Sequence, residues 1–570
     1  MIKKNTCFEV ICNMQGIISI FLLCCAYCGY AHEIGTLTND GNGEIIVPTE
    51  WGTKQYGVVF AWPTFNSFPE SPTYLLLLEM FMQITSGNDR IFLLVGNQNE
   101  YKSAQTAIQF YNAGTTYGGV SIGPTIKESN VVYISIPHTD FWMRDYFSLG
   151  RMRNDSSFYA VGDFDFDAWG FGGRYNSEGD TYIRVSSYFN SISNTDTQIA
   201  SKFASDMSKY QKLKTVNVQS WLRIEPGGLE FNEDKTSVSG SRRLIVSEAY
   251  LAQPERNFGK TIYDSVKELY RVFSVEDVIV LPKFRYNRGM GQEEVVQQCP
   301  MSDSALNFGG QEHWRHCFDP NSWYYMGVFG GGLVADDSTF IGTLKNEDSA
   351  TRRDSLGFSD PVYDNMLTPL TTNGHTGEWI RWVGPNTVVL SDIPGGQNAP
   401  KSSIAGRSWY RLNVIYNLLK QKNIDVVRIT TPANRIEYFG PGSCPYDSLL
   451  DMRFTKGEYF NPSTNDWVSA KNIPILSIFP KDSKVPFIST RSYLNYVVTD
   501  DKVLIAEYCS VDNTKESCDR DRLAKRTLSG IFDDIGKRTG IVRTVVQIKN
   551  VDKLNFCGGG MHCITQNHFE

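Results

Sequence analysis

The residues best suited to chemistry lie near the carboxy terminus, where a glycine-rich loop is followed closely by a cysteine. Residues 556–566 read Phe-Cys-Gly-Gly-Gly-Met-His-Cys-Ile-Thr-Gln. Glycines let the backbone adopt positive φ angles or approach a ligand closely, so Cys563 could meet a substrate from a fixed backbone. A frayed glycine tail is the alternative. The apolar strand expected over residues 541–548 should anchor the loop, which favours Cys563 as a nucleophile.

Three further stretches place acidic residues and a histidine beside glycines or aromatic residues. They are residues 141–146, Phe-Trp-Met-Arg-Asp-Tyr; residues 225–232, Glu-Pro-Gly-Gly-Leu-Glu-Phe-Asn; and residues 374–379, Gly-His-Thr-Gly-Glu-Trp. With the carboxy-terminal run, they resemble in order the motifs of the guanidino-modifying enzymes, in particular the Porphyromonas-type peptidylarginine deiminases and the agmatine deiminases. The resemblance covers nearly the whole chain except the first ~45 residues and a long insertion.

Deimination needs a nucleophile for the guanidinium carbon, anions that hold the cation, and a group that moves protons. The resemblance implies that Cys563 attacks to form a covalent S-alkylthiouronium intermediate, which water hydrolyses to the ureido product. Asp145 would hold the guanidinium, because forked N–H donors suit a carboxylate. His375 would be the general acid/base, since its pKa suits proton transfer near neutrality. The alternatives are an Arg144–Asp145 pair at the surface and a structural cap at His375.

Three more residues are candidates for substrate binding. Glu225 precedes a Pro-Gly-Gly turn that would aim its side chain, with a buried salt bridge as the alternative. Asn495 resembles part of the family's Tyr-x-Asn strand and could hydrogen-bond substrate, or it is an ordinary residue at a strand edge. Arg174 follows Trp-Gly-Phe-Gly-Gly, where a substrate carboxylate could be met.

One position departs from the family pattern. The family's His-x-Asp gives the guanidinium a second carboxylate, but residue 377 is glycine here. Either the neighbouring Glu378 reaches in, or the contact is lost, or the protein binds guanidines without turning them over. A lost charged hydrogen bond costs on the order of 1.5–3 kcal/mol. Because Cys563, His375 and Asp145 occur together, we predict an enzyme.

The expected activity is that of a secreted deiminase, which converts arginine in peptides or proteins to citrulline plus ammonia. An agmatine deiminase and a catalytically lapsed guanidine-binding protein are the alternatives. Secretion favours peptides or proteins, since agmatine deiminases usually serve intracellular polyamine metabolism. The net charge of −7 disfavours nucleic acid as a partner, because phosphate binding needs clustered Lys and Arg. We expect no cofactor.

The amino terminus has the pattern of a signal peptide. Lys3 and Lys4 precede an apolar stretch at residues 17–26, and residues 29–31, Gly-Tyr-Ala, offer the small side chains that a signal peptidase reads. The apolar run is too short for a bilayer of ~30 Å. We therefore expect cleavage near Ala31, a secreted or luminal location, and membrane contact only through this segment. An uncleaved signal anchor is the alternative.

Cysteine counting agrees with an oxidising compartment. Five of the twelve cysteines lie in the presumed signal segment, which leaves seven. An odd number suits three disulfides and one unpaired thiol, for which we choose Cys563. Proximity in sequence suggests the pairs Cys509–Cys518 and Cys299–Cys317, and the remainder is Cys444–Cys557.

From residue 48 onward, short apolar strands alternate with amphipathic helices, which predicts an α/β fold. The expected helix and strand pairs are 74–84 with 91–95, 101–111 with 131–136, 261–273 with 278–282, 408–420 with 425–429, and 520–537 with 541–548. A hairpin over residues 496–505 makes the sheets mixed. The resemblance implies a pentein fold, a five-bladed pseudo-symmetric α/β propeller of ββαβ units around a central funnel. Periodicity alone would also suit a doubly wound sheet with an appended domain.

Residues 32–570 are expected to form a single deiminase domain, interrupted by an insertion at about 283–373. An unstructured loop of this length would be unusual, so we predict a disulfide-pinned lid or subdomain beside the site. Residues 313–317, His-Trp-Arg-His-Cys, could be read as a metal cluster. The second half of a zinc ligand set is absent from the sequence, so we expect no metal.

Overall fold

The computed structural model covers the chain from residue 43 to residue 569 with gaps. The described residues are 43–63, 72–87, 89–114, 125–138, 141–164, 183–184, 198–210, 214–222, 224, 226–232, 242–247, 251, 262–282, 284–287, 292–295, 376–399, 401, 404–432, 436–439, 458–461, 466–469, 485–488, 491–556 and 559–569. The predicted signal peptide and most of the predicted insertion lie outside them. No helix in these ranges is long and apolar enough to cross a membrane.

Within the described residues, one ββαβ arrangement occurs in five sheets. In each, two antiparallel strands are followed by a helix and by a third strand parallel to the second. Four of these units are continuous in the sequence. The first of them consists of β5 (Phe147–Met152), β6 (Tyr159–Asp163), α6 (Ile199–Tyr210) and β8 (Thr215–Gln219). The second consists of β9 (Leu229–Asn232), β10 (Arg243–Ser247), α8 (Ile262–Val272) and β11 (Asp277–Leu281).

The other two continuous units come from the second half of the chain. One consists of β14 (Ile380–Gly384), β15 (Thr387–Asp392), α15 (Ile404–Gln421) and β16 (Asp425–Thr430). The other consists of β21 (Val497–Val498), β22 (Lys502–Ala506), α19 (Lys515–Thr539) and β23 (Thr544–Ile548).

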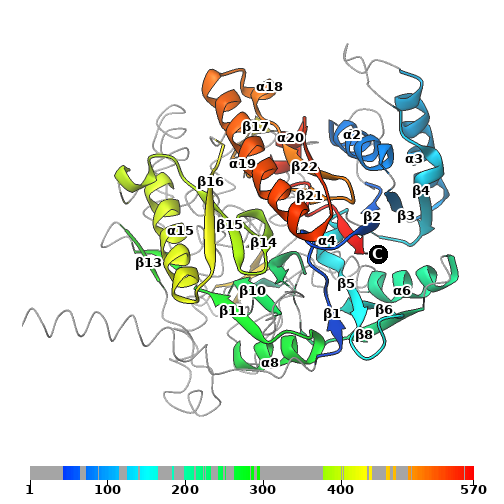
Figure 1. Cartoon of the computed structure of the whole chain (residues 1–570), viewed down its shortest axis with the longest axis horizontal. Helices are drawn as coiled ribbons and strands as arrows, with labels where there is room; N and C mark the ends of the chain where they lie inside the picture. Colours follow the sequence, from blue (N-terminus) through cyan, green and yellow to red (C-terminus); the bar gives the residue numbers. More distant parts are fainter. Residues whose placement is uncertain are drawn as a thin grey trace, which may run out of the picture.

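The fifth sheet joins the two ends of the described chain. Its strands are β24 (Gln566–Phe569), β2 (Gln55–Ala61), β3 (Arg90–Val95) and β4 (Val131–Ser135), and β24 is antiparallel to β2. Helices α2 (Pro72–Ser86) and α3 (Gln98–Asn112) connect its parallel strands. Figure 1 shows the five sheets in chain order around the middle of the molecule, where α4 (Met143–Tyr146) lies.

Short elements complete the described chain. They are β1 (Ile45–Ile46), β7 (Ile183–Arg184), β12 (Phe284–Asn287), β13 (Gln292–Val295), β17 (Ile436–Phe439), β18 (Glu458–Asn461), β19 (Asp466–Ser469), β20 (Val485–Ile488), α18 (Cys509–Asp512), α20 (Val551–Phe556), and the 3₁₀ helices η2 (Glu128–Asn130), η4 (Pro226–Gly228), η7 (Thr376–Glu378) and η8 (Gly396–Asn398). The predicted mixed α/β fold is confirmed, with all five expected helix and strand pairs present.

The ends of the elements differ from the prediction where capping residues decide them. Helix α19 begins before the predicted residue 520, because the side chain of Thr514 caps it by accepting from the Ser517 N–H. The helix ends at Gly540, whose φ of 75° only glycine adopts readily. The strand expected to start at residue 541 therefore starts at Thr544.

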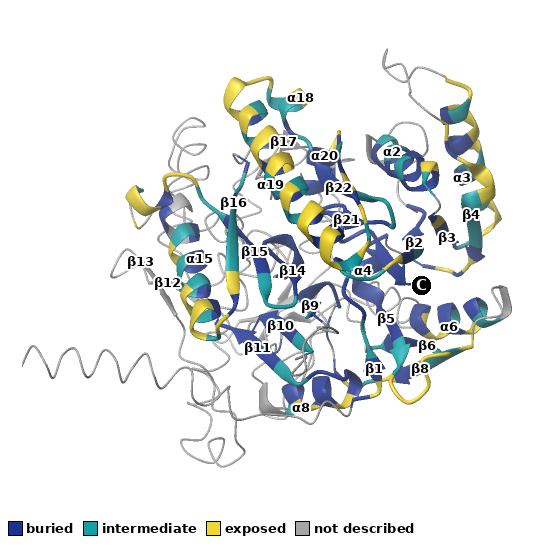
Figure 2. Ribbon diagram, in the orientation of Figure 1, coloured by how far each residue is buried: buried dark blue, intermediate teal, exposed yellow. Residues whose placement is uncertain are grey.

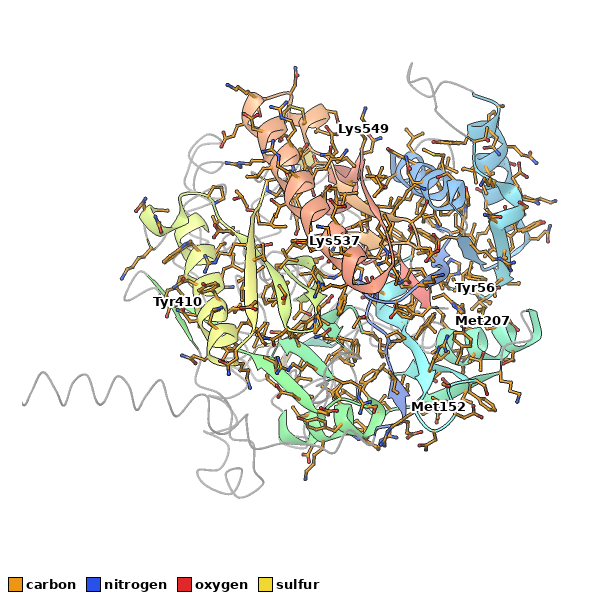
Figure 3. The ribbon with its side chains drawn as sticks, in the orientation of Figure 1. Tyr56, Met152, Met207, Tyr410, Lys537 and Lys549 are labelled. Carbon is orange, nitrogen blue, oxygen red and sulfur yellow. A yellow bond between two sulfur atoms is a disulfide. The ribbon has the colours of Figure 1, made fainter. Side chains whose placement is uncertain are left out.

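The sheets lie in the interior because their strands are apolar. The strands carry apolar runs, such as Ile-Phe-Leu-Leu-Val in β3, which are buried on both faces. The helices cover the sheets with one apolar side, and Figure 2 shows exposed residues on the outer sides of α3, α15 and α19. Tyr410, labelled in Figure 3, lies on α15 and is exposed. Burial of this apolar surface, at ~25 cal/mol per Å², stabilises the packing of the units against one another.

Candidate active site

Cys563 lies in the turn before β24 and is buried. Its backbone N–H donates to the carbonyl of Gly560 at 3.1 Å, and its own carbonyl accepts from the Arg144 N–H at 3.0 Å. The side chain of Asn495 holds the turn from another direction. Its Oδ1 accepts from the His562 N–H at 2.6 Å, and its Nδ2 donates to Cys563 Sγ at 3.2 Å. The thiol is therefore fixed by both backbone and side-chain contacts.

The glycines before Cys563 are required for close packing. A Cβ at Gly559 would collide with the indole ring of Trp142, and a Cβ at Gly560 would lie 2.5 Å from the amide carbon of Asn495. Neither residue is among the described glycines with positive φ. The loop is thus glycine-rich because neighbouring side chains press against its backbone.

Glu378 is the carboxylate that the structure brings to the thiol. It ends the 3₁₀ helix η7, and the Cys563 thiol donates to its Oε1 at 3.5 Å. Burial raises the pKa of Glu378 to about 8, and the contact with the thiol opposes that rise. Its Oε2 is buried and makes no hydrogen bond to any described residue. A buried carboxyl oxygen without a partner is costly, and it offers an acceptor to an incoming cation.

Asp145 is a second carboxylate that acts on the same thiol electrostatically. It lies in α4 and is 7% exposed, and Arg144 is 8% exposed, so the alternative of a surface ion pair between them is excluded. The Arg144 guanidinium instead pairs with Glu50 at 2.9 Å. Burial raises the pKa of Cys563 well above its usual value, and the negative charges of Glu378 and Asp145 raise it further. In the free site Cys563 therefore stays a thiol, and a thiolate becomes favourable only when a positive charge binds beside it.

A side chain at position 377 would meet Glu230 and His562. A Cβ at this position would lie 2.6 Å from Glu230 Oε1 and 3.2 Å from His562 Nδ1. An aspartate here would therefore meet another carboxylate. Thr376 Oγ1 donates to the Gly228 carbonyl at 2.9 Å, and Ser492 Oγ donates to the Glu378 carbonyl. These contacts fix η7 so that residue 378, and not residue 377, faces Cys563.

Of the other predicted site residues, the structure describes Asn495 and leaves three outside the described ranges. Asn495 contacts the thiol, as described above, and its role toward substrate stays a prediction. His375, Glu225 and Arg174 lie outside the described residues, and their roles stay predictions too. The bond from Thr376 Oγ1 to the Gly228 carbonyl does bring the segments that follow His375 and Glu225 together.

The cysteines follow the prediction as far as the structure describes them. Cys509 and Cys518 form a disulfide, with their Cα atoms 4.5 Å apart, and Cys563 is the free cysteine of the described chain. The predicted pairs Cys299–Cys317 and Cys444–Cys557 lie outside the described residues. So does the histidine-rich stretch at 313–317. Across the described ranges, no three His, Cys, Asp or Glu side chains are grouped to hold a metal ion.

A set of buried charged and titratable residues beside the site was not predicted. Its members are Glu50, Arg144, Glu230, Arg381 and His562. Burial raises the pKa of Glu230 to about 7, and the Arg381 guanidinium opposes the rise from 3.3 Å. These residues come from distant parts of the chain, so no local pattern could have grouped them.

The sequence profile of the Porphyromonas-type peptidyl-arginine deiminases matches residues 46–290 and 353–568. The chain belongs to this family, whose members are hydrolases that act on carbon–nitrogen bonds of amidines. No curated protein sequence matches the chain significantly.

Solved structures of deiminases have a similar fold. A structural-genomics target assigned as an agmatine deiminase is 16% identical, with a TM-score of 0.52 over 94% of this chain and 98% of its own. Agmatine deiminase of Enterococcus faecalis is 15% identical, with a TM-score of 0.50 over 94% and 98%. A Porphyromonas gingivalis protein assigned as an arginine deiminase is 14% identical, with a TM-score of 0.47 over 92% and 98%. At identities this low, the first two structures show a shared fold.

Proposed function

We propose that this chain is a secreted deiminase that converts arginine residues of peptides or proteins to citrulline, with Cys563 as the nucleophile. The observation that carries the proposal is the contact of Cys563 Sγ with Glu378 Oε1 at 3.5 Å inside a buried site that also holds Asp145. A nucleophile flanked by two carboxyl groups and shielded from water suits a planar cation. The family match supports the same chemistry.

The reaction proceeds in two balanced steps. The Cys563 sulfur forms a bond to the guanidinium carbon, one carbon–nitrogen bond breaks, and the thiol proton leaves with the departing nitrogen as ammonia. The product of this step is the S-alkylthiouronium cation. Water then adds its oxygen to the same carbon, the carbon–sulfur bond breaks, and one water proton returns to sulfur. The ureido product is released together with the second proton, which protonates ammonia.

The substrate itself supplies the charge that activates the thiol. A guanidinium placed between Asp145 and Glu378 neutralises the two charges that raise the thiol pKa, and its own positive charge lowers that pKa. The same cation lowers the pKa of Glu378. Asp145 and Glu378 each accept N–H donors of the guanidinium. In this scheme Glu378 provides the second carboxylate that the family's aspartate provides elsewhere.

The remaining site residues complete the proposal. His375 carries protons to the departing ammonia and from the attacking water. Asn495 holds the thiol in place and donates to substrate, while Glu225 and Arg174 contact the rest of the substrate. None of these steps requires a metal or another cofactor.

The five ββαβ units support a pentein propeller. Figure 1 shows the sheets around the middle of the molecule, and in the fifth sheet the pairing of β24 with β2 joins the last described strand to an early strand of the chain. We infer that the five units form one closed ring whose loops converge on Cys563.

The choice of substrate rests on the amino terminus. A signal peptide would carry the protein to a compartment where peptides and proteins, and not intracellular agmatine, are the available guanidines. The disulfide between Cys509 and Cys518 supports an oxidising compartment.

The test is an assay of the chain expressed without residues 1–31, with an arginyl peptide and with agmatine as separate substrates. We expect ureido product and ammonia in equal amounts from the peptide, and slower conversion of agmatine. Faster conversion of agmatine would overturn the substrate. Turnover of neither by folded protein would leave the lapsed guanidine-binding alternative.

A further inference from the structure

The three segments that carry the proposed reacting groups meet at one carboxylate, that of Glu50. Arg144 Nη1 donates to Glu50 Oε1 at 2.9 Å, and His562 Nε2 lies 3.1 Å from the same oxygen. Arg381 Nη2 donates to the other oxygen, Oε2. One anion thus receives donors from three separate parts of the chain.

Each donor is close in sequence to a proposed reacting group. Arg144 precedes Asp145, and His562 precedes Cys563. Arg381 lies in β14, directly after the 3₁₀ helix that presents Glu378. A shift of any donor is therefore transmitted through a few backbone bonds to the group beside it.

Two of the donors also bind backbone around the thiol. The Arg144 N–H donates to the Cys563 carbonyl at 3.0 Å. Arg381 Nη1 donates to the carbonyls of Leu494 and Tyr496, at 3.3 Å and 3.1 Å. These two residues flank Asn495, which donates to Cys563 Sγ. Glu50 is thus connected through Arg381 to the backbone on both sides of Asn495.

The electrostatics favour a persistent anion at this junction. Burial alone would raise the pKa of Glu50, but Arg144, Arg381 and His562 hold it well below its usual value. Burial lowers the pKa of His562 well below its usual value, and the two guanidinium charges add to the effect. The ring is therefore neutral, and its Nε2–H donates, since an ionised carboxylate only accepts. The anion keeps two like-charged guanidiniums together.

We propose that Glu50 is a positioning residue that sets Asp145, Glu378 and Cys563 in register without touching the substrate. This role rests on the proposed function, and it assigns no chemistry to Glu50. A purely structural ion pair would contribute to stability and leave turnover by the folded enzyme unchanged.

The test compares two variants at Glu50 with a control. Glu50→Gln removes the charge at nearly constant shape. Glu50→Asp keeps the charge but is shorter by one methylene, so it cannot reach all three donors. The control is Glu268→Gln in α8, a buried carboxylate that accepts from Arg271 and Ser220. The apolar residues of α8 belong to a different hydrophobic cluster from Cys563.

Two readouts are measured on folded protein. With an arginyl peptide, kcat should fall about ten- to a hundredfold in both Glu50 variants, because a misplacement of ~1 Å can cost about a hundredfold, and KM should change less than kcat. By hydrogen exchange, amides in residues 141–146, 376–382 and 559–564 should exchange faster together in both variants. The control should retain kcat and should exchange faster only around α8.

Either of two results would overturn the positioning role: a kcat within about threefold of the wild type, or unchanged exchange in those segments. If Glu50→Gln does not fold, Glu50→Asp decides alone by the same criteria. If the wild-type protein converts no guanidine, the proposed function fails. The exchange result then still decides whether Glu50 connects the three segments.

Discussion

Replacement of Glu378 by glutamine tests whether it is the second carboxylate of the site. The guanidinium carbon must approach within about 3–3.5 Å of the sulfur to react. Glu378 Oε1 lies 3.5 Å from Cys563 Sγ, so the same carboxylate is in reach of the guanidinium N–H groups. Loss of a charged hydrogen bond costs about 1.5–3 kcal/mol. At ~1.4 kcal/mol per factor of ten, kcat/KM should fall by about 10- to 150-fold.

The same substitution should make the free thiol more reactive. The charge of Glu378 raises the pKa of Cys563, and glutamine removes that charge. The pH profile for alkylation of Cys563 by iodoacetamide should therefore move to lower pH, while deimination becomes slower. A folding defect that exposes Cys563 would also speed alkylation, so circular dichroism must show that the variant is folded before the two changes are compared. Glu268→Gln serves as the control, because the apolar residues of its helix, α8, belong to a different core cluster from Cys563.

Steady-state kinetics with an arginyl peptide and alkylation followed by mass spectrometry provide the two measurements. An unchanged kcat/KM in Glu378→Gln would refute the assignment of Glu378 to the guanidinium. A parallel loss of kcat/KM and of alkylation would show that the substitution disturbs the turn at Cys563.

Three further outcomes are expected. Gly377→Asp should lower the free energy of unfolding by about 1–3 kcal/mol in urea titrations and should give no gain in kcat, because its Cβ would lie 2.6 Å from Glu230 Oε1; higher activity would contradict the placement of η7. Gly559→Ala should lower kcat at least tenfold by driving Trp142 against the Cys563 turn, whereas Gly530→Ala, with open space around its Cβ in α19, should add roughly 0.5–1 kcal/mol of stability and leave kcat unchanged. The free energy of unfolding should also depend on the protonation of Glu378, whose pKa is raised from 4.5 to about 8 by burial in the folded state. The stability that the protonated carboxyl contributes is fully present below pH 4.5 and is lost as the pH rises through 8. Between pH 4.5 and 8, the free energy of unfolding of Glu378→Gln should therefore rise relative to that of the wild type by up to ~1.4 kcal/mol per pH unit. Parallel plots of unfolding free energy against pH for the two proteins would contradict the raised pKa.

The helices and strands could be predicted because the periodicity of apolar residues within each segment indicates its secondary structure. Helix α15 and strand β16 follow directly from amphipathic and apolar periodicity. Asp145 lies among aromatic residues in the sequence, which suits its burial. The free thiol at Cys563 and the Cys509–Cys518 disulfide followed from counting cysteines.

The features that escaped prediction depend on contacts between distant residues. The pairing of Val59 in β2 with Gln566 in β24 leaves no signal in either segment. The donors to Glu50 come from three regions of the chain, and ion pairs of this kind have no spacing rule. The orientation of η7, which turns Glu378 rather than Gly377 to the thiol, depends on Thr376 and Ser492 finding carbonyl partners. Recurrence of ββαβ units came from the family resemblance, because periodicity alone also suited a doubly wound sheet.

The central claim is that the sulfur of Cys563 bonds to the guanidinium carbon. The most direct measurement is mass spectrometry of the protein quenched in acid during turnover of an arginyl peptide. We expect an adduct equal to the substrate less ammonia on the peptide that contains Cys563, and neither adduct nor turnover in Cys563→Ser. Turnover that persists in Cys563→Ser, with Cys563 unmodified in the wild type, would contradict the account.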